Sequence, residues 1–322
     1  MNASRVTKKA ERKGCAGIAR RLPSRNPRVD INVDIWLLRV AWISLPLTAG
    51  PAAADALAPW GTAPREVGEV LLWVLWAVVL VSVLAPQPLS LTAARTGIPL
   101  AFVAAAFAVL SGRPSTLAAI GALSVTVITF VLVALPGFSR ACAQGAAYGD
   151  EERFPLRVPP VLFLGILPFA VLAVGAGIAT GPLLLAAERW VLGALAVLVG
   201  FPIAWLLLRS LHQLARRWVV LVPAGLVVAD PMTLSDPVLF IREHIEGVGP
   251  ADPGRRPPEE AEDLRLGAAS GSVAILLDED FELSRRSSDR SRGVRTHLLL
   301  VATVQSRTLL ERAEARRIRV RT

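Results

Sequence analysis

Long apolar runs alternate with short polar segments between residues 35 and 208. A helix needs about 20 mostly apolar residues to cross a hydrocarbon core about 30 Å thick. Six windows meet or approach this requirement, and we predict spans at about 35–53, 68–85, 96–111, 117–136, 159–180 and 184–208. The pattern therefore predicts an α-helical membrane bundle of about six transmembrane helices over residues 35–208.

The first window contains Arg39, one turn after its start. An arginine near a span end can extend its guanidinium to the interface, so we predict a retained span. A cleaved signal peptide, ending at Ala52-Ala53-Ala54, is the alternative that the sequence leaves open. In and just after the fifth window, Ala173, Gly177 and Gly181 are spaced by four, which predicts a close approach to another helix.

After residue 208 the pattern changes to short runs rich in β-branched and aromatic residues, separated by Pro and Gly turns. We predict strands at Trp218–Val222, Gly225–Ala229, Val238–Arg242, Ile245–Val248, Leu264–Leu266, Ser272–Leu277, Phe281–Leu283 and His297–Val304. A helix is expected over 307–319, with Leu309, Leu310, Ala313 and Ile318 on its apolar side. Residues 209–322 therefore read as a small, mainly-β domain with a C-terminal helix.

Two stretches of this domain carry a resemblance. "RWVVLVPAGLVVADPMTLSDPVLFIREHIEGV" resembles the opening of bacterial pleckstrin-homology-like (PH-like) domains, and "HLLLVATVQSRTLLERAEARRI" is similar to their last strand and helix. The resemblance covers roughly residues 212–319. The whole chain resembles uncharacterised multi-span membrane proteins of actinobacteria that join six spans to such a domain. The resemblance implies a PH-like fold and brings no activity with it.

Composition and charge support this organisation. The chain is 53% hydrophobic and 19% charged, which excludes a soluble protein and a disordered one. Residues 1–34 hold nine Lys and Arg against three acidic residues, and we predict that they form a disordered basic cytoplasmic tail. The predicted inner segments also carry Arg95, Arg140, Arg153, Arg157, Arg209, Arg216 and Arg217, whereas the outer loops carry Arg65 and Arg113. This asymmetry predicts a multi-pass plasma-membrane protein with both termini cytoplasmic.

The sequence offers little catalytic or metal-binding chemistry. His212, His244 and His297 lack cysteine or carboxylate partners at zinc-like spacing, and we read 278–280 (Asp-Glu-Asp) as a solvated turn. We find no phosphate-binding loop and no nucleophile motif. We therefore predict a protein without enzyme activity, cofactor or metal. The clear spans carry no acidic residue at their midplanes, which argues against an ion-coupled transporter.

One charged loop suggests a contact with phosphate. Arg285, Arg286, Arg290 and Arg292 are candidate contacts for anionic headgroups, and Ser287 and Ser288 are candidate phosphorylation sites. Our leading hypothesis is an integral membrane protein that anchors a PH-like module, which binds a cytoplasmic or membrane protein or inner-leaflet lipid. The alternative is a small-solute transporter or channel subunit with a regulatory cytoplasmic domain. Because the excess basic charge lies on the tail rather than on a folded domain, we expect no nucleic acid partner.

Overall fold

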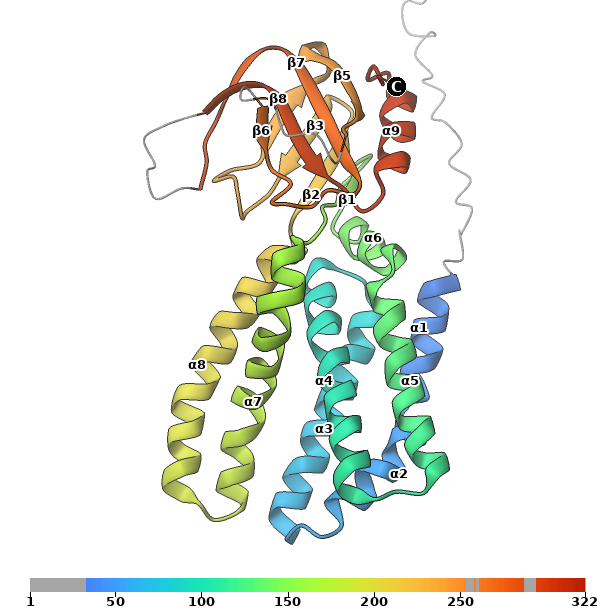
Figure 1. The fold of residues 1–322 in the computed structure, drawn as a ribbon, viewed down its shortest axis with the longest axis vertical. Coiled ribbons are helices and arrows are strands. Elements are labelled where there is room, and N and C mark those ends of the chain that lie inside the picture. The colour runs from blue at the N-terminus through green and yellow to red at the C-terminus, as the bar shows by residue number, and fades with distance from the viewer. Residues whose placement is uncertain (1–32, 253–257, 259–260, 287–293, 322) are drawn as a thin grey trace, which may run out of the picture. The chain divides into compact units, whose positions relative to one another are not determined.

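The computed structural model describes residues 33–252, 258, 261–286 and 294–321. Six helical segments in these ranges are long and apolar enough to span a membrane, which confirms the predicted number (Figure 1). They are Val33–Leu57 (α1, Val33–Ile43, with α2, Leu45–Leu57), α3 (Thr62–Leu84), α4 (Pro88–Gly112), α5 (Thr116–Ala134), Leu162–Ala186 (the π-helical η1, Leu162–Ile166, with α7, Leu167–Ala186) and α8 (Trp190–Ala215). A shorter helix, α6 (Pro136–Gln144), follows α5.

The largest difference from the predicted spans concerns α4, which begins at Pro88 rather than at residue 96. Proline suits the first turn of a helix because the N–H that it lacks would have no intrahelical acceptor there. Hydropathy missed this part of the helix, since Ser90, Thr92 and Arg95 interrupt the apolar run. Arg95, which we had placed in an inner loop, therefore lies inside a span.

Arg39 lies in α1 and has protein partners. Its Nε donates a hydrogen bond to the carbonyl oxygen of Val83 at 3.0 Å, and its Nη2 donates to that of Leu84 at 3.3 Å. Both carbonyls belong to the last turn of α3, where the backbone has no intrahelical donors left. Its guanidinium carbon also lies 5.4 Å from the Trp36 ring centroid. The charge in the first span is thus satisfied by the end of a neighbouring helix.

Helices α7 and α8 lie side by side as a hairpin (Figure 1). A Cβ atom on Gly177 would lie 2.7 Å from the carbonyl oxygen of Gly200, and a Cβ on Gly200 would lie 2.7 Å from that of Gly177. Gly181 is similarly close to Val197. The predicted face of small residues is therefore the α7–α8 interface.

Replacing Gly200 by alanine is expected to destabilise the protein by about 1–3 kcal/mol, because the added methyl group forces the two helices apart. The midpoint of thermal unfolding of the full-length protein in mild detergent measures this effect. Gly165→Ala is the matched control, since a Cβ atom there meets nothing within 4 Å. Equal midpoints for the two variants would contradict the close approach.

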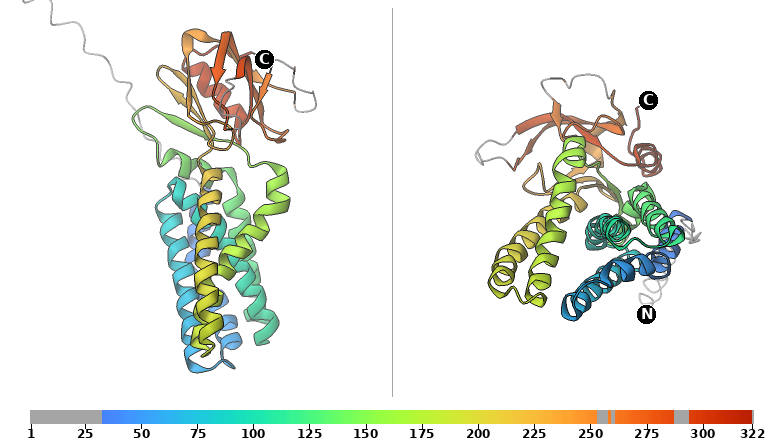
Figure 2. Two further views of the ribbon diagram at one scale, coloured as in Figure 1. Left: turned by 90° about the vertical axis from the view of Figure 1, so that its left-hand side faces the viewer. Right: turned by 60° about the horizontal axis from the view of Figure 1, so that its bottom comes forward.

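The remaining described elements form a β region of two four-stranded sheets and one helix (Figure 2). The first sheet has the order β1-β2-β3-β4 and the second the order β5-β7-β8-β6. The strands are β1 (Glu152–Pro155), β2 (Trp218–Val222), β3 (Gly225–Ala229), β4 (Val238–Ile241), β5 (Ile245–Pro250), β6 (Ala261–Asp263), β7 (Ser272–Leu283) and β8 (Val294–Ala302), with a 3₁₀ turn, η2 (Arg242–His244), and the helix α9 (Ser306–Ala315).

The first sheet includes a strand from outside residues 209–322. Strand β1 comes from the segment between α6 and η1, and it pairs antiparallel with β2. The second sheet also differs in detail from the prediction. The strand expected over 264–266 lies at β6 and runs parallel to β8, and the two strands expected between Ser272 and Leu283 are one bulged strand, β7.

Both sheets and α9 contribute to one hydrophobic core. Phe154 of β1 and Phe240 of β4 are buried in it, together with Val273 of β7. Leu309 and Ala313 bring α9 onto this core, as predicted. The predicted helix ends earlier than expected, at Ala315, but Ile318 beyond it is still buried in the core.

Candidate functional site

Two of the four predicted headgroup-binding arginines lie in the described part of the chain, and both have protein partners. Arg285 forms an ion pair with Glu262 of β6. Arg286 donates a hydrogen bond from Nη1 to the carbonyl oxygen of Pro231 at 2.8 Å. The other predicted residues of this site, Arg290, Arg292, Ser287 and Ser288, lie outside the described residues. Within the described residues, Arg285 and Arg286 are therefore both bound to other parts of the β region.

The ion pair with Arg285 offsets part of the unfavourable burial of the Glu262 carboxylate. Burial raises the pKa of the Glu262 carboxyl, and the charge and hydrogen bond of Arg285 act against that rise. For the neighbouring Asp263, burial also favours the neutral form, but the hydrogen bonds and charge of Arg265, together with the charge of Arg285, lower the pKa of this carboxyl. Arg285 therefore has a partner within the β region, and a change at this residue would leave the carboxyl of Glu262 without it.

A second, fully buried ion pair joins distant segments of the β region. Arg217 donates from Nε to Asp230 Oδ1 at 2.8 Å and from Nη2 to Oδ2 at 2.7 Å. The same guanidinium donates to the carbonyl oxygens of Arg157 at 3.0 Å and Leu264 at 3.3 Å. This side chain therefore ties together the segments after β1, α8, β3 and β6. From the sequence, Arg217 is expected only as a basic residue at the end of the last span.

Three surface residues could hold a metal ion. Nδ1 of His244 lies 3.3 Å from Oδ1 of Asp278 and 3.3 Å from Oε1 of Glu279. Both acids lie in the irregular part of β7, between Leu276 and Phe281, rather than in a turn. All three side chains are at least one-third exposed, and the distances are also those of a histidine–carboxylate ion pair. We assign no metal to them.

The bundle contains a polar cluster that sequence reasoning missed, at the end where α4 begins and α8 finishes. Thr92 Oγ1 of α4 lies 3.0 Å from Nδ1 of His212 of α8. Arg95 follows one turn later on α4, and Cys142 of α6 is buried nearby. Burial raises the pKa of the Cys142 thiol to about 12, although the Arg95 charge lowers it in part. The thiol is therefore neutral at physiological pH.

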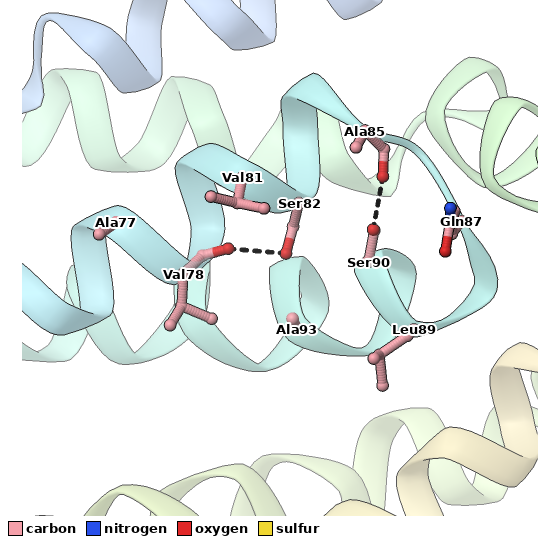
Figure 3. Close-up of a pocket in the computed structure, with 9 residues that line it drawn as sticks. All are labelled: Ala77, Val78, Val81, Ser82, Ala85, Gln87, Leu89, Ser90 and Ala93. Carbon is pink, nitrogen blue, oxygen red and sulfur yellow. Dashed lines mark hydrogen bonds between the residues drawn. The ribbon is translucent and has the colours of Figure 1, made fainter.

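An open groove of about 500 Å³ lies between the end of α3 and the start of α4 (Figure 3). Ser82 and Ser90 are its hydroxyl residues, and they donate hydrogen bonds to the carbonyl oxygens of Val78 at 2.7 Å and Ala85 at 2.6 Å. Val81 and Leu89 line it with exposed aliphatic side chains. With both hydroxyls bonded to backbone, the groove presents a mainly apolar surface to the membrane.

The described residues combine a membrane bundle and a β region, with the partly buried Arg95 in the first and the buried Arg217 in the second. The arginine of the β region, Arg217, has a carboxylate partner, whereas Arg95 of the bundle lies beside a neutral thiol. Comparisons with family models, with curated proteins and with solved structures found no match to the chain.

Proposed function

We propose that the protein is a non-enzymatic integral membrane protein whose bundle anchors a PH-like module on the cytoplasmic side, and that this module binds a protein partner. Two sheets that share a core with a C-terminal helix support the PH-like assignment. Inner-leaflet lipid is the other ligand that the sequence suggests. The intramolecular partners of Arg285 and Arg286 favour the protein.

The observation that carries the proposal is the pairing of β1 with β2. The two strands flank the α7–α8 hairpin in the chain, and they are paired from Glu152↔Leu221 to Pro155↔Trp218. The ladder continues to the hairpin, because the N–H of Leu156 donates to the carbonyl oxygen of Arg217 at 3.0 Å. The α7–α8 hairpin thus follows β1 and precedes β2, and these two strands are neighbours in one sheet. A partner on this sheet is therefore mechanically connected to the bundle.

The β4 edge of the first sheet, which pairs with no other described strand, is the surface that suits a partner. Strand β4 is an edge strand, with Phe240 buried and Leu239 and Ile241 44% and 46% exposed. An edge strand offers unpaired N–H and C=O groups to an added strand, and the side chains on its open face provide specificity. We therefore propose that the partner adds an extended segment along β4.

A photo-crosslinking residue at position 241 of the full-length protein tests this proposal in cells. We expect one discrete protein adduct, which disappears when Leu239 is changed to Asp. Position 266 is the matched control, because Leu266, like Ile241, is an exposed aliphatic residue of the β region but lies outside the strands. Adducts of equal yield at both positions, or adducts with phospholipid alone, would refute a protein partner on β4.

The proposed orientation makes a separate prediction. Reporter fusions after Pro114, between α4 and α5, are expected to be active outside the membrane, and fusions after Arg217, beyond α8, inside it. The physical reason is the excess of Lys and Arg in the predicted inner segments. An outside reporter at Arg217 would reverse the orientation of the bundle.

A further inference from the structure

Arg95 lies on the packed face of α4. Leu91 and Ile98, one turn before and one turn after it, are both buried in the core of the bundle. Side chains three and four residues apart share one face of a helix, so the Arg95 side chain starts from the protein-facing side of the span rather than from its lipid-facing side. It remains partly exposed. Most of the Arg95 side chain therefore lies among the packed helices, and only a smaller part of its surface is open.

Arg95 has no counter-charge in the described part of the chain. No hydrogen bond or ion pair joins it to another described residue. The nearby Cys142 thiol is neutral, as its raised pKa shows. Helices α4, α6 and α8 contain no Asp or Glu, and the acidic residue that the start of α1 brings to this end, Asp34, lies beside Gly137 of α6 and forms no ion pair with Arg95. Arg39 donates hydrogen bonds to carbonyl oxygens at the end of α3, whereas Arg95 donates none to the described backbone.

Other polar and basic groups lie around the same position. Thr92, one turn before Arg95, contacts His212 of α8 at 3.0 Å. Arg209 stands three residues before His212 and shares its side of α8, and Arg216 directly follows the helix; both are exposed. Two helices thus bring cationic and hydrogen-bonding groups to one end of the bundle without an acidic residue of their own.

The geometry points to a binding site for a phosphate group at this end of the bundle, with Arg95 as its principal ligand and His212 beside it. A guanidinium presents five donors in a planar fork that fits two phosphate oxygens at once. Basic pockets between transmembrane helices are a recurrent way to hold anionic lipid headgroups. Arg95 is seven residues from the start of α4, about 10 Å along the helix axis, which is within reach of the headgroup layer.

A phosphate ligand would supply the opposite charge that Arg95 lacks inside the span. A charged group inside a span is unfavourable unless it is paired, and the membrane surface at this depth supplies anionic phosphate. The site belongs to the bundle and does not depend on a partner of the β region. Its failure in an experiment would therefore leave the proposed function intact.

The test uses full-length protein in mild detergent and follows retained lipid by native mass spectrometry and stability by thermal unfolding. Phosphatidylglycerol, phosphatidylcholine with the same acyl chains and inorganic phosphate are added separately. We expect phosphatidylglycerol to bind and to raise the unfolding midpoint more than phosphatidylcholine does. Arg95→Gln should weaken that binding about 10- to 100-fold, since charge-assisted hydrogen bonds are lost. Arg113→Gln, in the exposed turn after α4, is the matched control and should bind like the wild type.

The comparison of ligands identifies the source of the phosphate. Protection by phosphatidylglycerol without protection by inorganic phosphate indicates a lipid headgroup, and protection by both indicates a soluble phosphate compound. If Arg95→Gln does not fold, Arg95→Lys keeps the charge but lacks the fork, and intermediate binding is expected. Wild-type protein that does not distinguish phosphatidylglycerol or inorganic phosphate from phosphatidylcholine would overturn the proposal.

Discussion

Replacing Asp230 by alanine is expected to destabilise the β region by about 3–5 kcal/mol, because it leaves the charge of Arg217 buried without a partner. The two side chains are 2% and 0% exposed and are joined by two short hydrogen bonds. The carbonyl oxygens of Arg157 and Leu264 would still accept hydrogen bonds from Arg217 but would not neutralise it. The midpoint of thermal unfolding of the full-length protein in detergent measures the loss.

Two further variants separate the buried charge from other effects. Glu311→Ala removes an exposed ion pair with Arg307 on α9 and is expected to leave the midpoint unchanged. Replacing Arg217 by methionine together with Asp230 by leucine should recover most of the lost stability, since no buried charge then remains. A wild-type midpoint for Asp230→Ala alone would show that the pair is accessible to water in solution.

The membrane spans could be predicted from the sequence because their physical requirement is local. A stretch of apolar residues long enough to cross the hydrocarbon core is visible without knowledge of its neighbours, as in the predicted window 117–136 and the helix α5. The start of α4 was missed because its residues are not apolar enough to be recognised by this local criterion. Thr92 and Arg95 have neighbours on α8 and α6, and such packing is not a property of a sequence window.

In the β region, local turns were predictable and distant pairings were not. Strands β2 and β3 were predicted to the residue, because Pro223 and Gly225 mark the turn between them and Gly225 adopts a φ of +158°. Strand β1 was missed because four residues between two spans carry no strand pattern. Its partner lies more than 60 residues away in the sequence.

Arg217 and Arg95 also show that contacts between distant segments cannot be predicted from a local sequence pattern. Arg217 follows Arg216 at the end of a span, where basic residues are expected from membrane topology alone. Only the fold shows that Arg216 is exposed while Arg217 turns inward to Asp230. Sequence reasoning likewise counted Arg95 as a topological charge. Its position among buried residues became visible only when α4, α6 and α8 were seen together.

Phe154→Ala is expected to destabilise the β region by about 3–5 kcal/mol, because it leaves a cavity in the shared core. Phe154 is 1% exposed and packs with buried residues of both sheets, although it belongs to the segment between α6 and η1. The amide protons of β2 should also exchange faster in this variant, since β1 covers one edge of β2. Thermal unfolding in detergent and hydrogen exchange of peptides from residues 218–222 measure the two effects.

The control for this change is Phe163→Ala, in the π-helical turn that starts the next span. Phe163 is 56% exposed, so its loss should leave both the midpoint and the exchange of β2 unchanged. Exchange in α3 should stay slow in both variants, because α3 contributes no residue to the core that contains Phe154. A Phe154→Ala protein with wild-type stability and wild-type exchange would show that β1 is not part of the first sheet. The connection that we propose between the α7–α8 hairpin and the binding edge at β4 would then be lost.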